Sequence, residues 1–195
     1  MVVAACLLVL TAPVAAAVAV AVRLRLGSPV LFRQVRAGRD GRPFTIHKFR
    51  TMLDETGPDG RERTEEERLT RLGAFLRAAS LDELPQLVDV LRGDMALVGP
   101  RPLYVDYVPL YTAEQARRLD VRPGITGLAQ VSGRNELPWD RRLALDVEYV
   151  DTRSVLLDLR ILARTAGRVV SREGVTQTGH ATNEMFTGSR EQAGL

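Results

Sequence analysis

The 195-residue sequence is poor in cysteine, histidine and aromatic residues, and each shortage excludes a class of protein. Its single cysteine, Cys6, excludes an internal disulfide and a cysteine-based metal cluster. The two histidines, His47 and His180, lack the spacing of metal ligands, and neither a P-loop nor a G-x-S-x-G motif is present. Aromatic residues make up 5% of the chain and do not alternate with basic ones, so we expect no nucleic-acid partner.

What the chain does contain is the composition of an ordinary folded domain. Hydrophobic residues make up 45% and charged residues 26%, and the chain is long enough to bury a core without disulfides. The net charge is +3, and Lys48 is the only lysine, so arginine dominates the basic residues. Because the guanidinium fork suits fixed recognition of phosphate and carboxylate, this bias favours a ligand of that kind.

Residues 1–22 contain no charged side chain, and a run of that length is typical of a helix that inserts into a bilayer. Arg23 and Arg25 follow it, and basic residues at that end favour a cytoplasmic location for the chain beyond. A cleaved signal peptide is the competing interpretation, supported by the small residues at 15–17. No basic region precedes the run, however, so we expect a membrane anchor.

Pro13 lies in the middle of the apolar run, where a proline removes one helical hydrogen bond and clashes with the preceding turn. We therefore expect a break in the helix. Two topologies stay open: a broken helix that still spans the bilayer, or two short halves that dip into it and return to the same side.

The rest of the chain predicts an α+β fold that is mainly helical, with a small β-hairpin and several amphipathic helices. Apolar and β-branched residues on both sides of the turn at 38–41 predict a hairpin over residues 30–52. Residues 54–67 read as an exposed loop, and 122–135, with three glycines, as a shaped loop. Apolar residues at helical spacing predict helices over 65–79, 84–91, 112–119 and 154–172. Gly93 is expected to end the second helix.

The helix predicted over 154–172 carries Arg160, Arg164, Arg168 and Arg172 at four-residue intervals along one face. A basic amphipathic helix of this kind suits an anionic membrane surface. A core-packing helix with solvated arginines is the alternative, and the sequence leaves both open.

The stretch 80-SLDELPQL-87 places two carboxylates, Asp82 and Glu83, side by side. Ser80 and Glu83 fit a capping box, and the unpaired N–H groups of a first helical turn would keep Asp82 ionised. An ionised aspartate can act as a nucleophile toward phosphorus, and a neighbouring carboxylate can hold Mg²⁺ or move a proton. A simple helix cap and a working pair are both compatible with this stretch.

Basic residues elsewhere favour the working pair, because several suit phosphate. Arg101 lies between two prolines and Arg134 follows a glycine-rich loop, so both sit on segments that are restricted before binding. His47 is expected to be structural. The candidate phosphate-binding residues are Lys48, Arg50, Arg77, Arg101 and Arg134.

Five motifs in order carry a resemblance to a known family: 48-KFRTM-52, 80-SLDELPQL-87, 93-GDMALVGPRPL-103, 122-RPGITGLAQVSGRN-135 and 146-DVEYV-150. They resemble the bacterial sugar transferases, the monotopic phosphoglycosyltransferases that begin assembly of capsule, exopolysaccharide, lipopolysaccharide O-antigen and glycoprotein glycans. The resemblance runs from the apolar segment to about Arg172. It implies transfer of a sugar-1-phosphate from a nucleotide diphosphate sugar, usually a UDP-sugar, to polyprenyl (undecaprenyl) phosphate, with Mg²⁺ as cofactor.

The resemblance also implies roles for residues. Asp82 would be the nucleophile that forms a phosphosugar-aspartyl intermediate, with Glu83 as its partner near Mg²⁺. Basic residues would surround the phosphates and the nucleotide, and two further residues are candidates in the same region. The implied binding residues are Lys48, Arg77, Arg101 and Arg134, with Arg50, Asp146 and Tyr149 as the further candidates.

The implied organisation is a re-entrant membrane helix over 1–22, a catalytic domain on the cytoplasmic face of the inner membrane over 23–173, and a polar tail over 174–195. The chain departs from the family pattern in two places. Ala12 stands where the family has a serine before the proline, and the basic residues that usually precede the apolar segment are missing, which leaves a start upstream of Met1 open. The sequence does not fix the oligomeric state, and a homo-oligomer is allowed.

Two rival hypotheses stay open. One is a non-catalytic membrane-surface module that binds anionic lipid or a partner enzyme, with Asp82 and Glu83 only as a cap. The other keeps the reaction but has the polyprenyl phosphate attack directly, with Asp82 as base or metal ligand.

Overall fold

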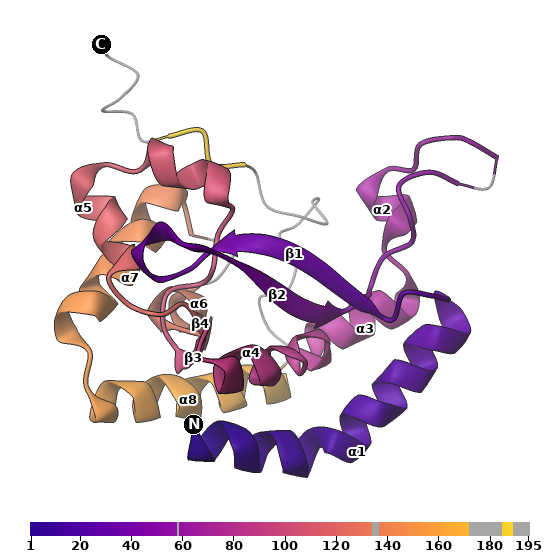
Figure 1. Ribbon diagram of the computed structural model, residues 1–195, viewed down its shortest axis with the longest axis horizontal. Helices are drawn as coiled ribbons and strands as arrows, with labels where there is room; N and C mark the ends of the chain where they lie inside the picture. The colour runs from indigo at the N-terminus through magenta and orange to yellow at the C-terminus, as the bar shows by residue number, and fades with distance from the viewer. Residues whose placement is uncertain (58, 134–136, 172–184, 189–195) are drawn as a thin grey trace.

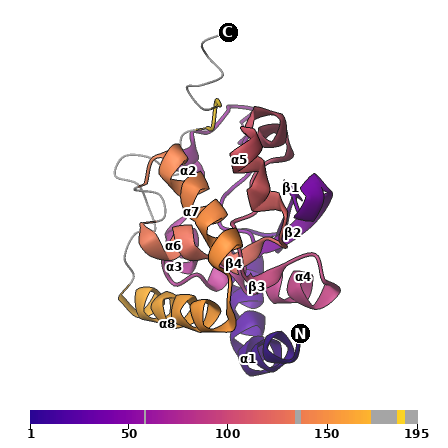
Figure 2. The ribbon, with the colours of Figure 1, turned by 90° about the vertical axis from the view of Figure 1, so that its left-hand side faces the viewer.

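The computed structural model describes residues 1–57, 59–133, 137–171 and 185–188. It confirms an α+β fold that is mainly helical, in which an antiparallel hairpin lies on one side of the domain and a short parallel strand pair lies among the helices (Figures 1 and 2). The α-helices are α1 (Val2–Arg25), α2 (Glu65–Arg68), α3 (Arg71–Ala78), α4 (Gln86–Arg92), α5 (Ala113–Ala116), α6 (Leu128–Ser132), α7 (Trp139–Thr152) and α8 (Val155–Ser171). The strands are β1 (Leu31–Ala37), β2 (Pro43–Phe49), β3 (Ala96–Val98) and β4 (Gly124–Thr126). The 3₁₀ turns are η1 (Arg39–Gly41), η2 (Leu81–Glu83), η3 (Val105–Leu110) and η4 (Arg117–Leu119).

The hairpin forms where the sequence predicts it, with β1 and β2 antiparallel and Leu31 opposite Phe49. The segment 122–135, predicted as an irregular loop, instead contains the strand β4 and the short helix α6. β4 pairs in parallel with β3, with Ala96 opposite Gly124. Periodicity cannot reveal a strand of three residues, because the pattern needs a longer run to appear.

Helix ends follow local chemistry. α4 ends at Gly93, whose φ of 88° lies in the left-handed region that glycine enters without a Cβ clash, as predicted. The single helix predicted over 65–79 is divided into α2 and α3, because Leu69 and Thr70 are extended. The Thr70 side chain then accepts a hydrogen bond from the N–H of Gly73 and starts α3 afresh.

The apolar N-terminal segment forms one helix, α1, which passes through Pro13 without interruption. The predicted break is therefore wrong; the ribbon changes direction along its length instead (Figure 1). A bend is the usual way in which a helix accommodates the missing hydrogen bond and the clash of an internal proline. By length and composition α1 could cross a membrane.

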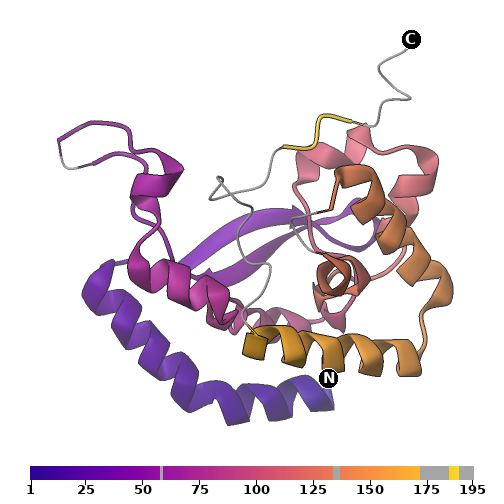
Figure 3. The same ribbon diagram turned by 180° about the vertical axis from the view of Figure 1, so that it is seen from behind.

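Both ends of α1 pack against the rest of the protein. Near the N-terminus, Ala4 is fully buried in a cluster with Ile46, Val90 and Met95. At the other end a second cluster forms around the helix; it comprises Val18, Val22, Leu26, Phe49 and Leu76. The helix thus lies along one side of the domain, as Figures 1 and 3 show.

Helix α8 lies beside α1 on that same side (Figure 2). Its inner face is anchored by Ile161, which packs with Val98 and Tyr149 in the core. Its outer face exposes Leu156 and Leu159 together with basic side chains. One face therefore packs in the core, as the core-packing alternative requires. Contact of the exposed face with an anionic membrane surface stays a prediction.

The described part of the C-terminal tail packs on the domain. Phe186 is buried, and its backbone N–H donates to the hydroxyl of Tyr107. Rings of Tyr111 and Trp139 surround it. The tail predicted over 174–195 is therefore attached at this point.

Candidate active site

The structure brings predicted residues together from four segments. β2 carries Lys48, α3 carries Arg77, η2 carries Asp82 and Glu83, and the loop after β3 carries Arg101. The Lys48 ammonium donates to Oε1 of Glu83 at 2.6 Å, and the Arg101 guanidinium donates to the same oxygen at 3.1 Å. These five residues are called the carboxylate cluster below.

The pKa values of the two carboxyl groups in the cluster are shifted in opposite directions. Burial, and next the negative charge of Glu83, raise the pKa of Asp82 to about 6, against the opposing effect of Lys48. For Glu83, burial alone would raise the pKa, but Lys48 and Arg101 outweigh it and lower the pKa to about 2. Glu83 therefore holds the permanent charge, and Asp82 is the group that titrates near neutral pH.

The capping box predicted at Ser80 is wrong. Ser80 has a φ of 54°, its side chain makes no capping hydrogen bond, and η2 is a single 3₁₀ turn rather than the start of a helix. The Glu83 carboxylate reaches Lys48 and Arg101 instead of the Ser80 N–H. The expectation that a helix end holds Asp82 ionised is wrong as well, because burial raises its pKa. The rival in which these carboxylates are only a cap loses its structural basis.

Arg77 reaches the cluster because α3 packs very close to the end of β2. A Cβ on Gly73 would lie 1.8 Å from the carbonyl oxygen of Thr51, so only glycine fits there. The Arg77 Nε then donates to Thr51 Oγ1 at 3.1 Å. Burial lowers the pKa of Arg77 and the negative charge of Asp82 raises it, which places its cation near that carboxyl group.

Arg50, one of the predicted binding residues, does not join the cluster. Arg50 donates to the carbonyl oxygens of Ser28 and Met52 and forms an ion pair with Asp54 at 2.8 Å. These contacts hold the two ends of the hairpin and favour a structural role. Arg134 lies outside the described residues.

Asp146 is connected to the cluster through Arg118. The buried Arg118 donates to Asp146 Oδ2 from Nε at 3.1 Å and from Nη2 at 2.8 Å. The same Nη2 donates to the carbonyl oxygen of Arg101 at 2.6 Å, so the ion pair fixes the main chain that carries the Arg101 side chain. These contacts favour positioning over direct substrate contact for Asp146, and Tyr149 is likewise held inside, by Val98 and Asp158.

Arg118 is a residue that positions the site and that the sequence did not reveal. Its neighbour Arg117 has the same charge but lies at the surface, where it pairs with Glu114 and Asp151. Only the three-dimensional packing of η4 against α7 distinguishes the two arginines, so no local signal could have found Arg118.

His47 is structural, as predicted. Its backbone N–H donates to Asp89 Oδ2 at 3.0 Å, and its Nδ1 lies 2.7 Å from Asp89 Oδ1. Asp89 is fully buried on α4, so the pair ties β2 to that helix next to Lys48.

Comparison with known proteins gives consistent matches. The family model described as "Bacterial sugar transferase" matches residues 1–172. "Uncharacterized sugar transferase EpsL" of Bacillus subtilis (strain 168) is 56% identical over 168 residues, which cover 86% of this chain and 83% of that protein.

Two further relatives have more specific names. "UDP-glucose:undecaprenyl-phosphate glucose-1-phosphate transferase" of Caulobacter vibrioides is 48% identical over 173 residues, 83% of this chain and 64% of that protein. "Undecaprenyl-phosphate galactose phosphotransferase" of Salmonella typhimurium is 40% identical over 167 residues, 77% of this chain and 35% of that protein. This chain therefore spans only part of the length of these two relatives.

Proposed function

Because the chain belongs to the bacterial sugar transferase family, we propose that it transfers a sugar-1-phosphate from a UDP-sugar to polyprenyl phosphate. The observation that carries the proposal is the carboxylate cluster, in which a titratable aspartate lies beside a fixed glutamate and three cations. Names of relatives that specify undecaprenyl phosphate support the acceptor, and the UDP-glucose in one name supports the donor.

In the first step, the ionised Asp82 carboxylate attacks the phosphorus that bears the sugar. The bond from that phosphorus to the bridging oxygen breaks, UMP leaves, and the sugar-phosphate stays on the Asp82 oxygen. A pKa of about 6 keeps most Asp82 side chains ionised at neutral pH while leaving them more basic than an ordinary aspartate.

In the second step, an oxygen of polyprenyl phosphate attacks the phosphorus of the intermediate. The bond to Asp82 breaks, the lipid-linked diphosphate sugar leaves, and the carboxylate is regenerated. Lys48, Arg77 and Arg101 supply fixed positive charge for the phosphoryl oxygens in both steps. Because Glu83 already orients Lys48 and Arg101, little reorganisation is needed when substrate binds.

The donor set of the cluster fits Mg²⁺ as a cofactor. Mg²⁺ is commonly held by one or two carboxylates together with substrate phosphates and water. Asp82 and Glu83 offer such oxygens, and no group of three or more metal-binding side chains occurs among the described residues. Glu83 would hold the ion, which would neutralise charge on the diphosphate of the donor.

The proposal places the exposed side formed by α1 and α8 in the membrane. Apolar side chains cover α1, and both of its ends pack on the same domain, which supports a re-entrant placement over a helix that leaves the domain to cross a bilayer. A re-entrant α1 would leave the carboxylate cluster on one face of the membrane. Arg23 and Arg25 at the end of α1 support the cytoplasmic face, where nucleotide sugars are available.

A UMP-release assay tests the proposal. The full chain in detergent is supplied with undecaprenyl phosphate, Mg²⁺ and each member of a panel of UDP-sugars. We expect release of UMP with at least one UDP-sugar, dependent on the lipid acceptor for continued turnover. Absence of release with every donor, from folded protein, would contradict the proposed function.

A second assay separates the covalent route from direct attack by the acceptor. Labelled UMP and an accepted UDP-sugar are incubated with enzyme but without polyprenyl phosphate. The covalent route predicts that label appears in the UDP-sugar, because the first step is reversible. An enzyme that turns over but shows no exchange would favour direct attack.

A further inference from the structure

A hollow of about 300 Å³ lies apart from the carboxylate cluster, and no residue of the cluster lines it. It is found at the amino-terminal ends of β3 and β4, where Ala96 and Arg122 contribute to its wall. Arg101, by contrast, follows the carboxyl end of β3. The hollow is therefore a separate feature of the surface, and nothing in the proposed reaction uses it.

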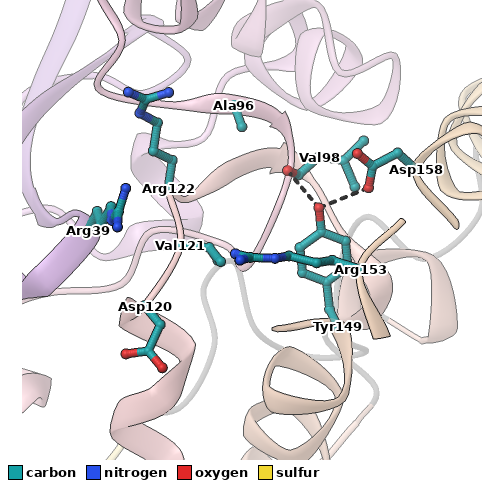
Figure 4. Close-up of a pocket in the computed structure, with 9 residues that line it drawn as sticks. All are labelled: Arg39, Ala96, Val98, Asp120, Val121, Arg122, Tyr149, Arg153 and Asp158. Carbon is teal, nitrogen blue, oxygen red and sulfur yellow. Dashed lines mark hydrogen bonds between the residues drawn. The ribbon is translucent and has the colours of Figure 1, made fainter. Parts of the chain in front are cut away.

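Arginines from three separate segments surround this hollow: Arg39 from η1, Arg122 from the loop before β4, and Arg153 from the turn between α7 and α8 (Figure 4). Within the described part of the chain, Arg122 and Arg153 make no hydrogen bond or ion pair through their side chains. Arg39 has a long contact of 3.8 Å with its neighbour Asp40 and is 59% exposed. We call this feature the arginine pocket.

Acidic residues do not neutralise the arginine pocket. Two aspartates line it, against three arginines. One of them, Asp158, already accepts a hydrogen bond from the Tyr149 hydroxyl at 2.9 Å, and Asp120 lies exposed at the rim. The planar guanidinium groups of Arg122 and Arg153, which form no ion pair among the described residues, suit the oxygens of a phosphate.

The arginine pocket borders the exposed apolar surface of α8. Arg153 comes two residues before Val155, the first residue of α8, which is 77% exposed. Leu156 and Leu159 continue the exposed apolar stripe on a helix that lies beside α1 (Figures 1 and 2). Arginines next to exposed apolar residues are typical of the level of lipid headgroups.

We propose that the arginine pocket binds the phosphate of an anionic phospholipid of the leaflet in which α1 and α8 are inserted. The proposal rests on the membrane placement given above, but not on the transfer reaction. The lipid phosphate would contact Arg122 and Arg153, with Arg39 closing the far side, while its acyl chains continue along Val155 and Leu156. Bound lipid would fix the rotation of the domain on the membrane.

Native mass spectrometry of the full chain, released from detergent after addition of phosphatidylglycerol or phosphatidylcholine, tests the proposal. Wild-type protein is expected to retain phosphatidylglycerol in preference to phosphatidylcholine. The double variant Arg122→Gln/Arg153→Gln is expected to bind phosphatidylglycerol about 30-fold more weakly, because two guanidinium–phosphate contacts are lost.

The matched control is Arg61→Gln/Arg63→Gln, which removes the same charge from the segment between β2 and α3. That segment projects away from α1 and α8 (Figure 1), so the control variant should bind phosphatidylglycerol within about threefold of wild type. Arg61, Arg122 and Arg153 are exposed and Arg63 is partly buried, and thermal unfolding checks that each double variant is folded. If the pocket variant fails to fold, Arg153→Gln alone gives the same comparison.

Equal retention of phosphatidylglycerol by the pocket and control variants would overturn the proposal, and so would wild-type protein that does not distinguish the two lipids. Selective loss of polyprenyl phosphate, with phosphatidylglycerol unchanged, would overturn it too. The proposed reaction fails separately, by absence of UMP release in an enzyme that still retains phosphatidylglycerol.

Discussion

Two carboxylates, the partly buried Glu83 and the buried Asp146, are each paired with arginine, yet the two regions differ in what they can do. The Glu83 side chain is 15% exposed, is shared by Lys48 and Arg101, and lies beside a second carboxyl group. Asp146 and its partner Arg118 are 5% and 2% exposed, and among the described residues Arg118 pairs with no second carboxyl group. The first arrangement can exchange a partner for a substrate phosphate, whereas the second is sealed and can only hold its neighbours in place.

The two regions are connected through one main-chain group. Arg118 donates to the carbonyl oxygen of Arg101, whose side chain donates to Glu83. The buried Arg118–Asp146 pair thereby fixes the main chain of Arg101, a residue of the carboxylate cluster. A desolvated ion pair adds little net stability, but removing one partner leaves the other as an unpaired buried charge. Substitutions can therefore affect the Arg118–Asp146 pair and the carboxylate cluster separately.

The largest effect is expected from Asp82→Asn, which removes the nucleophile. UMP release should fall by about four orders of magnitude, because the amide cannot form the intermediate. The melting temperature should not fall, since the substitution removes a buried charge next to Glu83. Asp106→Asn, at an exposed carboxylate outside the cluster, is the matched control and should keep full activity. Substantial turnover by Asp82→Asn would contradict the assignment.

Next in size is the effect of Arg118→Ala on stability. The free energy of unfolding should fall by about 3–5 kcal/mol, because Asp146 is left buried without its cation. Urea unfolding measures the loss. Adding Asp146→Asn to the same protein should restore part of the free energy of unfolding, because it removes the unpaired buried charge. A loss below about 1 kcal/mol on Arg118→Ala would show that the pair is not shielded from water.

Arg101→Gln should give the reverse pattern, with activity lowered by about a hundredfold and stability nearly unchanged. The Arg101 side chain is 47% exposed, and Glu83 keeps its contact with Lys48. Comparing UMP release with urea unfolding for this variant and for Arg118→Ala separates the two regions. A large loss of stability on Arg101→Gln would remove the distinction between them.

The smallest effect concerns pH. Because Asp82 must be ionised, kcat/KM should decline as the pH falls through about 6, the pKa of this carboxyl group. Arg77 stabilises the ionised form of Asp82, so Arg77→Gln should raise the pKa and shift the acid limb upward, by about one pH unit or less. Profiles of kcat/KM against pH measure the shift. An acid limb near the ordinary carboxyl value of about 4 would contradict the burial of Asp82.

The sequence was a good guide to the elements with long patterns. The hairpin around Gly41 and the helix that ends at Gly93 follow the predictions. Both elements depend on a local signal, which is alternation for the hairpin and a left-handed glycine for the helix end. The structure also brings Lys48 and Arg101 into contact with Glu83, but the binding and catalytic roles of these three residues stay predictions.

The predictions that were wrong depend on tertiary packing. The sequence from Ser80 to Glu83 matches a capping box, but η2 packs against β2. The Glu83 side chain therefore accepts a hydrogen bond from Lys48 on β2 rather than from the backbone N–H of Ser80. Arg118 resembles Arg117 in sequence and differs from it only in burial. Pro13 predicted a break, whereas α1 continues through it.

The central claim is that Asp82 carries the sugar-phosphate between donor and acceptor. Mass spectrometry of the protein after brief reaction with an accepted UDP-sugar, without polyprenyl phosphate, tests it directly. The account predicts an added mass equal to one sugar-phosphate on the peptide that contains Asp82, lost when polyprenyl phosphate is supplied. An enzyme that forms product but shows no such adduct, or carries it on another residue, would contradict the account.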